Sequence, residues 1–192
     1  MDRSDVLPSP ERIAVFVDYH NVENSLRRAG ARVDTLDLVE YLIGKRQLIE
    51  CFFYIATHPK SEQCSEDDAK LRGLQMSGYL VRTKHGQRMV DGQLKCDFDV
   101  EIALDAYEFC RMSHPDTVVL VTGDGHFAPL AQRVRLQGTR VEVASMPDSI
   151  SSDLRAWANG FVDLCELAAD VDHMPLPEVT PEGAVKAEQS HA

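Results

Sequence analysis

The chain has 192 residues, 44% of them hydrophobic, and a formal net charge of −11 at pH 7. This length suits one domain with a sizeable core. The acidic balance argues against a general DNA-coating protein, which needs a broad basic face, but it is compatible with an enzyme that holds cations in an acidic pocket.

Short apolar runs alternate with segments of helical spacing along most of the chain. We expect buried strands at residues 12–17, 48–56, 79–83, 117–122 and 140–145. We expect helices at residues 21–30, 36–46, 61–78, 97–112 and 127–137, and a last helix within 150–168. Residues 84–95 have the glycines and polar residues of a hairpin.

This alternation predicts an α/β fold, a doubly wound and mainly parallel sheet of about five strands with helices on both faces. We expect a flexible arm at 1–11, one domain at 12–168, and a disordered tail at 169–192 because that segment has few apolar residues and three prolines. The sequence contains no GxGxxG or Walker-type loop, so no nucleotide cofactor is expected.

The cysteines and the N-terminus indicate the compartment. The five cysteines are odd in number and form no CxxC pair, which favours free thiols in a reducing cytosol. No apolar run approaches the length of a membrane span, and the N-terminus lacks the pattern of a signal peptide. We therefore expect a cytoplasmic protein with no membrane segment.

Three acidic residues stand where open α/β sheets place their sites, beyond the carboxyl ends of strands. Asp18 ends the first strand, Asp99 opens the helix near 97–112, and Asp124 follows the fourth strand between Gly123 and Gly125. Converging carboxylates repel one another unless a divalent cation lies among them, and oxygen ligands suit Mg²⁺ or Mn²⁺. Such an ion activates water for phosphodiester hydrolysis.

Each acid also has a structural alternative. Asp18 could equally be the N-cap of the helix that follows it, and Asp97 fits a cap better than a metal ligand. Asp97, Glu101 and Asp105 share one helical stripe, which could be a solvated face. Asp124 could be a turn residue. If Asp124 binds a cation, its two glycine neighbours are expected to let a phosphate approach closely.

Three separated motifs, "FVDYHN", "DFDVEIALDA" and "VTGDGHFAPLAQRVRLQGTRVEVAS", resemble the NYN domains, the LabA-type branch of the PIN-like nuclease superfamily. The resemblance runs from about residue 12 to 167. It implies a three-layer PIN-like fold and Mg²⁺- or Mn²⁺-dependent cleavage of RNA, with Asp18, Asp99 and Asp124 as the catalytic, metal-binding acids. Asn21 matches an Asn of the family that can orient a ligand or a metal-bound water, and Thr122 keeps the hydroxyl of a family Ser. Asp97 and Asp105 are further supporting acids beside this set.

Two positions depart from the family pattern. His126 stands where the family usually has a second Asp; it is either a fourth metal ligand, better suited to Mn²⁺ than to Mg²⁺, or a structural residue that caps the helix or binds a neighbouring carboxylate. We favour the structural role by a small margin. Asn159 stands where relatives commonly carry Asp. Both departures bear on activity more than on fold.

Basic residues precede the acidic helix and predict a nucleic-acid contact. The candidates in residues 82–95 are Arg82, Lys84, His85, Arg88 and Lys95. We expect this segment, the basic hairpin, to bind the phosphate backbone of RNA without reading bases; the alternative is an ordinary solvated hairpin. Tyr19 and His20 could stack on a nucleotide, although an aromatic residue at a strand end commonly lies in the core.

The leading hypothesis is a metal-dependent ribonuclease that acts on single-stranded RNA. The first alternative is a silent RNA-binding module that keeps the pocket but lost activity through His126. The second is a Mg²⁺-dependent phosphatase, which is weakened because no Asp-x-Asp or Cys-x₅-Arg motif follows a strand. The sequence leaves both a monomer and a homo-oligomer open.

Overall fold

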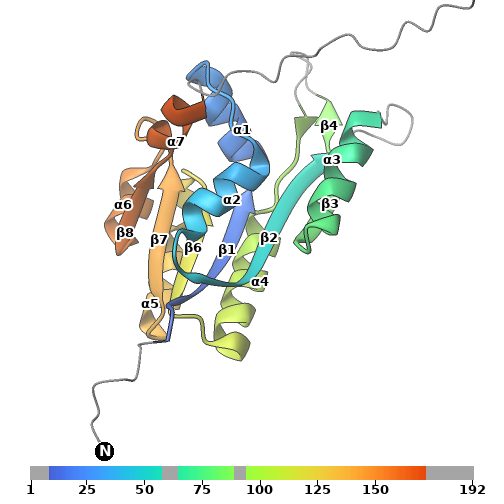
Figure 1. The fold of residues 1–192 in the computed structure, drawn as a ribbon. Helices are drawn as coiled ribbons and strands as arrows, with labels where there is room; N and C mark the ends of the chain where they lie inside the picture. Colours follow the sequence, from blue (N-terminus) through green and yellow to red (C-terminus); the bar gives the residue numbers. More distant parts are fainter. Residues whose placement is uncertain (1–8, 58–64, 89–93, 172–192) are drawn as a thin grey trace, which may run out of the picture.

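A computed structural model describes residues 9–57, 65–88 and 94–171. A central sheet runs through this part of the chain (Figure 1). Its strands are β1 (Arg12–Asp18), β2 (Gln47–Thr57), β3 (Leu80–His85), β6 (Thr117–Val121), β7 (Arg140–Ser145) and β8 (Gly160–Asp163). All neighbouring pairs are parallel, in the order β3-β2-β1-β6-β7-β8. The predicted α/β class is therefore confirmed.

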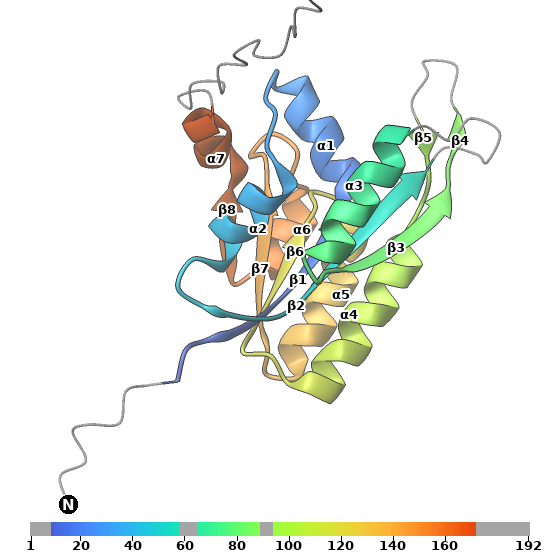
Figure 2. The ribbon, with the colours of Figure 1, turned by 45° about the vertical axis from the view of Figure 1, so that its right-hand side comes forward.

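Helices cover both faces of this sheet and give three layers (Figures 1 and 2). One face is covered by α1 (Tyr19–Arg28), α2 (Thr35–Ile43), α3 (Ser65–Met76) and α7 (Leu164–Val171). The other face is covered by α4 (Asp99–Ser113), α5 (Ala128–Leu136) and α6 (Ser152–Trp157). Each face has its own apolar cluster, because the side chains of a strand alternate between the two sides of a sheet.

The sheet has one strand more than expected. β8 lies inside the segment where a single helix was predicted, and that segment forms α6, β8 and α7 instead. β8 is only four residues long, it is half-buried, and it pairs with β7 alone, from Glu142↔Gly160 to Ser145↔Asp163. A strand this short shows no clear alternation in the sequence, so periodicity could not distinguish it from its helical neighbours.

The connection between β3 and α4 is confirmed as a hairpin. β4 (Gln87–Arg88) and β5 (Leu94–Lys95) pair in antiparallel fashion beside the main sheet. Among the residues that the structure describes, no helix has both the length and the apolar composition that crossing a membrane requires.

The strand order reverses at the centre of the sheet. From β1 the chain moves outward through β2 and β3, returns to β6 on the other side of β1, and then moves outward through β7 and β8. In open α/β sheets such a switch point leaves a crevice at the carboxyl ends of the two central strands. Asp18 and the segment after Val121 lie at this place, since Val17 pairs with Val121.

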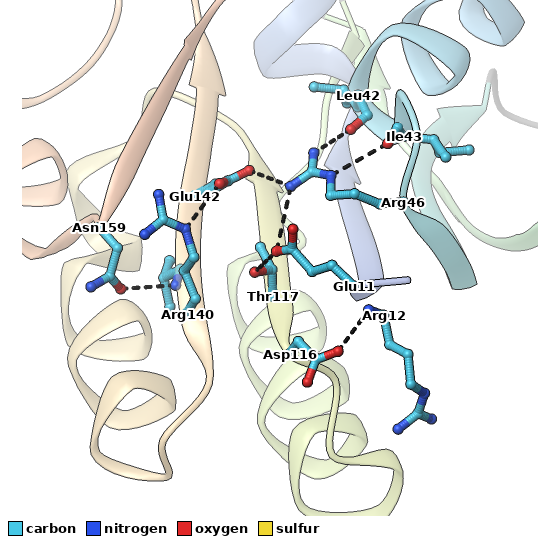
Figure 3. A network of polar contacts seen from close by, with 11 residues as sticks. Glu11, Arg12, Leu42, Ile43, Arg46, Asp116, Thr117, Arg140, Glu142 and Asn159 are labelled. Atoms are coloured by element: carbon cyan, nitrogen blue, oxygen red, sulfur yellow. Dashed lines mark hydrogen bonds and ion pairs between the residues drawn. The ribbon is translucent and has the colours of Figure 1, made fainter. Parts of the chain in front are cut away.

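The amino end of the sheet carries a network of paired charges (Figure 3). Arg46 lies 2.7 Å from Glu142, and Arg140 lies 3.1 Å from the same carboxylate. Asn159 belongs to this end: its side-chain oxygen accepts a hydrogen bond from the backbone N–H of Val141 at 2.9 Å. The departure from the family at Asn159 therefore lies far from the acids at the carboxyl end and supports the pairing of β7 with β8.

Candidate metal centre

Asp18 occupies the carboxyl end of β1 and has two polar contacts. Its Oδ1 accepts a hydrogen bond from the backbone N–H of Asn21 at 3.3 Å, which makes it the N-cap of α1. Its Oδ2 accepts from the hydroxyl of Thr122 at 3.5 Å. Asp18 therefore serves as a cap and still turns its second oxygen toward the segment that follows β6.

Asn21 and Thr122 hold that segment in place. The Asn21 side-chain oxygen accepts a hydrogen bond from the backbone N–H of Gly123 at 2.9 Å. The Thr122 hydroxyl, which donates to Asp18, accepts from the N–H of Asp124 at 3.2 Å. One hydroxyl thus links two of the predicted acids, and both supporting residues fix the position of the Asp124 loop.

Asp99, Asp124 and His126 form the tightest cluster of ligand atoms. One donor atom from each lies within 4.8 Å of the others. The Nδ1 atom of His126 is 3.2 Å from Asp99 Oδ2 and 3.3 Å from Asp124 Oδ1. His126 itself is largely exposed, so the cluster opens to solvent.

Asp18 lies outside that cluster but interacts electrostatically with two of its members, Asp99 and Asp124. Burial, together with repulsion from Asp99 and Asp124, raises the pKa of Asp18 from 3.8 to about 6, against the lowering effect of the Asn21 hydrogen bond. Burial and repulsion from Asp97 and Asp124 also raise the pKa of Asp99. Asp18 and Asp99 are therefore carboxylates whose charged forms are destabilised by burial and by neighbouring acids, and together with Asp124 they form a donor set that suits a hard divalent cation.

The N-cap of α4 is Phe98, which makes no side-chain capping hydrogen bond, and Asp97 just before it holds the first turn instead. The Oδ1 of Asp97 accepts a hydrogen bond from the backbone N–H of Asp99 at 2.8 Å. This contact fixes the first turn of α4 and the direction of Asp99. Asp97 therefore acts on the cluster through Asp99 and not as a member of it.

The other acids of the α4 stripe face β3, so the expectation of a solvated face is wrong for them. Glu101 forms an ion pair with Lys84, and Asp105 lies 3.3 Å from the Nε of Arg82. Asp105 also accepts a hydrogen bond from the hydroxyl of the buried Tyr54 at 2.9 Å. Arg82 and Lys84 are two residues apart on a strand, and Glu101 and Asp105 are four residues apart on a helix. Both spacings correspond to about 6 to 7 Å, so the two ion pairs form side by side.

These pairs change the expected role of the basic hairpin. The Lys84 ammonium contacts Glu101 and donates to the backbone carbonyl of Asp97 at 3.0 Å, so it fastens the first turn of α4. His85 contacts the hydroxyl of Thr57 at 3.2 Å. The side chains of Arg88 and Lys95, the remaining predicted contacts to RNA, lie outside the described residues.

The two residues after Asp18 also have partners. Lys70 lies over the ring of Tyr19, 4.1 Å from its centroid. His20 Nε2 is 3.3 Å from the carbonyl of Ala56, and its Nδ1 is 3.6 Å from Glu23. Both side chains join α1 to neighbouring elements, and one face of the Tyr19 ring is covered, so the structure favours a packing role over base stacking.

The glycines beside Asp124 are required by packing against the segment that follows β7. A Cβ at Gly123 would lie 2.2 Å from the backbone carbonyl oxygen of Ser149, and one at Gly125 would lie 2.7 Å from the Ser151 hydroxyl. The N–H of Ser151 donates to the Gly123 carbonyl at 2.9 Å. The segment after β7 is therefore a wall of the site.

Sequence reasoning did not identify this wall. Its residues are ordinary in composition, and the signal that could have revealed it is the pair of glycines on either side of Asp124. Two positions without side chains, one on each side of an acid, can indicate a close neighbour as well as an open surface. The position of the segment, beyond the carboxyl end of a central strand, also fits the rule for sites in such sheets.

Comparisons with known proteins identify the family of this chain and proteins similar to it. The family model described as "NYN domain" matches residues 12–165. The chain is 25% identical over 177 residues to the "Low amplitude and bright protein LabA" of Synechococcus elongatus, covering 88% of this chain and 92% of that protein. It also superposes on a crystal structure of a protein of unknown function from Vibrio parahaemolyticus with a TM-score of 0.69 and 26% identity, covering 83% of this chain and 96% of that one.

Proposed function

Since the chain belongs to the NYN domain family, we propose that it is a metal-dependent ribonuclease. The observation that carries the proposal is the meeting of Asp18, Asp99 and Asp124, from three separate segments, at the switch point of the sheet. Burial, together with repulsion from neighbouring acids, raises the pKa of Asp18 and of Asp99, so charging these two carboxyl groups costs free energy unless a cation offsets it.

The residues fit a divalent cation of the Mg²⁺ or Mn²⁺ type. Asp99 and Asp124 would hold it directly, with Asp18 on the buried side and His126 on the exposed side. A bound ion of this kind polarises a phosphoryl oxygen and supplies hydroxide near neutral pH. Carboxylate oxygens are its preferred ligands, and the imidazole of His126 shifts the preference toward Mn²⁺.

The surrounding residues keep the acids in position. Thr122 joins Asp18 to the backbone of Asp124, and Asn21 holds the N–H of Gly123. Lys84 fastens the first turn of α4 through Glu101 and thereby holds Asp99. RNA would reach the cluster from the side of His126, where the site is open to solvent.

The direct test is cleavage of labelled single-stranded RNA in Mn²⁺, with and without a chelator. We expect cleavage that the chelator abolishes, and we expect Asp124→Asn to reduce the rate by about 100-fold or more, as loss of a metal ligand commonly does. Asp37→Asn, which changes an exposed acid of α2, is the matched control and should cleave at the wild-type rate. Cleavage that survives both the chelator and Asp124→Asn would disprove the proposal.

A second function is favoured by the position of His126. A protonated imidazole between Asp99 and Asp124 relieves their repulsion as a metal would, so the fold could persist as an RNA-binding module without catalysis. The same assay separates the two: a gel shift without cleavage in either ion supports the module. Hydrolysis of a generic phosphoester but not of RNA would support the phosphatase instead.

A further inference from the structure

A cavity of about 610 Å³ lies between α1 and the start of α2. One side of α1 lines it from Tyr19 to Gly30, and the connection between the two helices lines it as well. Val17 and Tyr19, the two neighbours of Asp18 in the sequence, both line it. We call this cavity the α1 groove. It lies at the carboxyl end of β1, as the candidate metal centre does, but on the face of the sheet opposite α4 (Figures 1 and 2).

The floor of the α1 groove is apolar. Val22, Leu26, Val33 and Leu38 line it, and all but Val33 are buried members of the core cluster on this face. A concave apolar floor of this size accepts a flat or apolar part of a ligand, whose orientation is then fixed by polar groups at the rim. The rim of the α1 groove carries such groups, and their charge indicates which ligand fits.

Three arginines lie at this rim or beside it. Arg27 and Arg32 line the groove and are exposed, and Arg28 belongs to the same turn as Arg27. Arg27 donates to the side-chain oxygen of Asn24 at 2.6 Å, and Arg28 donates to the backbone carbonyl of the same residue at 3.2 Å. Within the described part of the chain, none of the three forms an ion pair with an acid. In a chain with a formal net charge of −11, unpaired guanidiniums at a cavity favour an anionic ligand.

The acids near the rim have other partners. Glu23 also lines the groove, but the Lys70 ammonium lies 3.8 Å from its carboxylate. Arg27 interacts electrostatically with Glu23 as well, without forming an ion pair with it. Asp34 caps the N-terminus of α2 through its side chain and Asp37 lies in the first turn of α2, so the positive end of that helix stabilises both. The arginines of the rim therefore remain available to an external anion.

We propose that the α1 groove holds one unpaired base of a single-stranded RNA, while Arg27 and Arg32 bind the phosphates on either side of that base. RNA offers both features that the groove requires: a flat base with an apolar face, and phosphates that a guanidinium binds through two parallel hydrogen bonds. This inference rests on the proposed function, since it locates the binding of the same RNA. The groove also supplies cations that the basic hairpin does not, because Arg82 and Lys84 are paired with acids of α4.

The position of the groove connects it with the acidic cluster. Tyr19 lines one end of the groove and follows Asp18 directly, so a strand that leaves the groove at this end reaches the carboxyl end of β1. From there the strand meets the cluster, which is open to solvent on the side of His126. The groove would therefore fix the position of the cleaved bond relative to the base that it holds.

Binding of a fluorescent single-stranded RNA to the full chain in chelator tests the role of the arginines without cleavage. The double substitution Arg27→Gln with Arg32→Gln should weaken binding about tenfold or more at low salt. It should also flatten the dependence of log affinity on log salt by about 0.7 for each lost phosphate contact. Arg111→Gln with Arg133→Gln is the matched control: it removes two exposed arginines from the last turns of α4 and α5 and should leave affinity and salt dependence unchanged.

An oligomer of the same length without bases tests the role of the groove floor. Wild type should bind it about tenfold more weakly than the RNA, because the phosphates remain but the base is lost. Ala31→Phe places a large side chain in the groove, so this variant should bind both oligomers alike. Thermal unfolding of Ala31→Phe shows whether the variant is folded, and the arginine variants test the proposal even if it is not.

Three results would overturn the proposal: an equal loss of affinity in the two arginine pairs, equal binding of both oligomers by the wild type, or displacement of the RNA by a peptide of residues 172–192. The last would make that segment the occupant of the groove. The ribonuclease proposal is judged separately. RNA binding that depends on Arg27 and Arg32 without cleavage in Mn²⁺ would refute the ribonuclease and support the groove, whereas cleavage with an unchanged KM in Arg27→Gln with Arg32→Gln would do the reverse.

Discussion

The surroundings of a buried carboxylate shift its pKa in opposite directions at the two ends of the central sheet. At the amino end, burial would raise the pKa of Glu142, but hydrogen bonds from Arg46 and Arg140 outweigh it and hold the pKa below its ordinary value. At the carboxyl end, burial and neighbouring acids raise the pKa of Asp18 to about 6. The first carboxylate stabilises the folded chain by being charged, and the second destabilises it.

This contrast distinguishes the paired charges that stabilise the fold from the clustered acids that form the candidate metal site. A carboxylate with two arginine partners needs nothing further, whereas clustered carboxylates need a cation that the chain itself does not supply in full. Acids with raised pKa values are concentrated at functional sites, and the rest of the fold must be stable enough to offset the free energy that their charge costs. The following substitutions at the two ends should therefore differ in size or in sign.

A Gly→Ala substitution at the carboxyl end of the sheet should have the largest effect on the free energy of unfolding. The same substitution at the amino end should have a small effect. In Gly123→Ala the new Cβ would meet the backbone of Ser149 at 2.2 Å, so we expect the free energy of unfolding to fall by about 3 kcal/mol. Gly160→Ala at the amino end meets the far end of the Arg140 side chain at 2.9 Å, which can move aside, and should cost less than about 1 kcal/mol. Urea unfolding measures both; equal losses would refute the close packing at Gly123.

Asp18→Asn should stabilise the protein when a chelator removes metal. Because the folded-state pKa of Asp18 is raised, its stabilising contribution is complete below the unfolded value near 3.8 and is lost as pH rises through about 6. Near neutral pH the neutral amide should therefore raise the free energy of unfolding by about 2 kcal/mol, while it keeps the capping acceptor.

The measurement for Asp18→Asn is urea unfolding from about pH 4.5 to 7.5 in chelator. The wild type should lose stability relative to Asp18→Asn across this window. Parallel curves for the two proteins would mean that Asp18 is not under the strain that its surroundings indicate.

Replacing a carboxylate by an amide at the amino end should change the free energy of unfolding in the opposite direction. Glu142→Gln removes the carboxylate that Arg140 pairs with and leaves Arg46 with only the longer pair to Glu11 at 3.9 Å, so we expect the free energy of unfolding to fall by about 1.5 kcal/mol near neutral pH. Glu40→Gln, at an exposed position of α2, should change it by less than about 0.5 kcal/mol. A gain in stability from Glu142→Gln in thermal unfolding would remove the contrast between the two ends.

His126→Asp should sharpen the contrast by adding a fourth acid to the carboxyl end. We expect Mg²⁺ to bind about tenfold more tightly, since a hard ion prefers the carboxylate oxygen to the imidazole nitrogen. The rise in melting temperature with Mg²⁺ measures the change. His114→Asp, at the far end of α4, is the control and should leave the Mg²⁺ response unchanged; an equally unchanged response in His126→Asp would make His126 structural only.

Local patterns predicted the parts of this molecule that depend on local rules. The five longer strands are apolar runs bounded by polar segments, and Asp18 and Asp124 could be identified because they follow such runs directly. Helical spacing puts Asp97 and Asp105 on one stripe of the helix with Glu101, apart from Asp99, and of these acids the structure brings only Asp99 into the cluster with Asp124.

The parts that sequence reasoning missed depend on contacts between distant segments. The packing of Ser149 against Gly123 joins two loops that belong to different strands, and no pattern within either loop records it. Lys84 was predicted to bind RNA because it lies in a basic segment directly before the acidic helix, but its partner Glu101 becomes visible only when α4 lies against β3. Composition gives the charge of a segment and not its partners.

The strand order also determines when the site can come into existence during synthesis. Asp18 and Thr122, whose contact links two of the acids, are 104 residues apart in the chain. While the protein emerges from the ribosome, β1 can pair with β2 early, but its other edge must wait for β6. An unfinished chain that stops before β6 therefore carries Asp18 and Asp99 without Asp124, and the three acids gather only after the segment that follows β6 has been made.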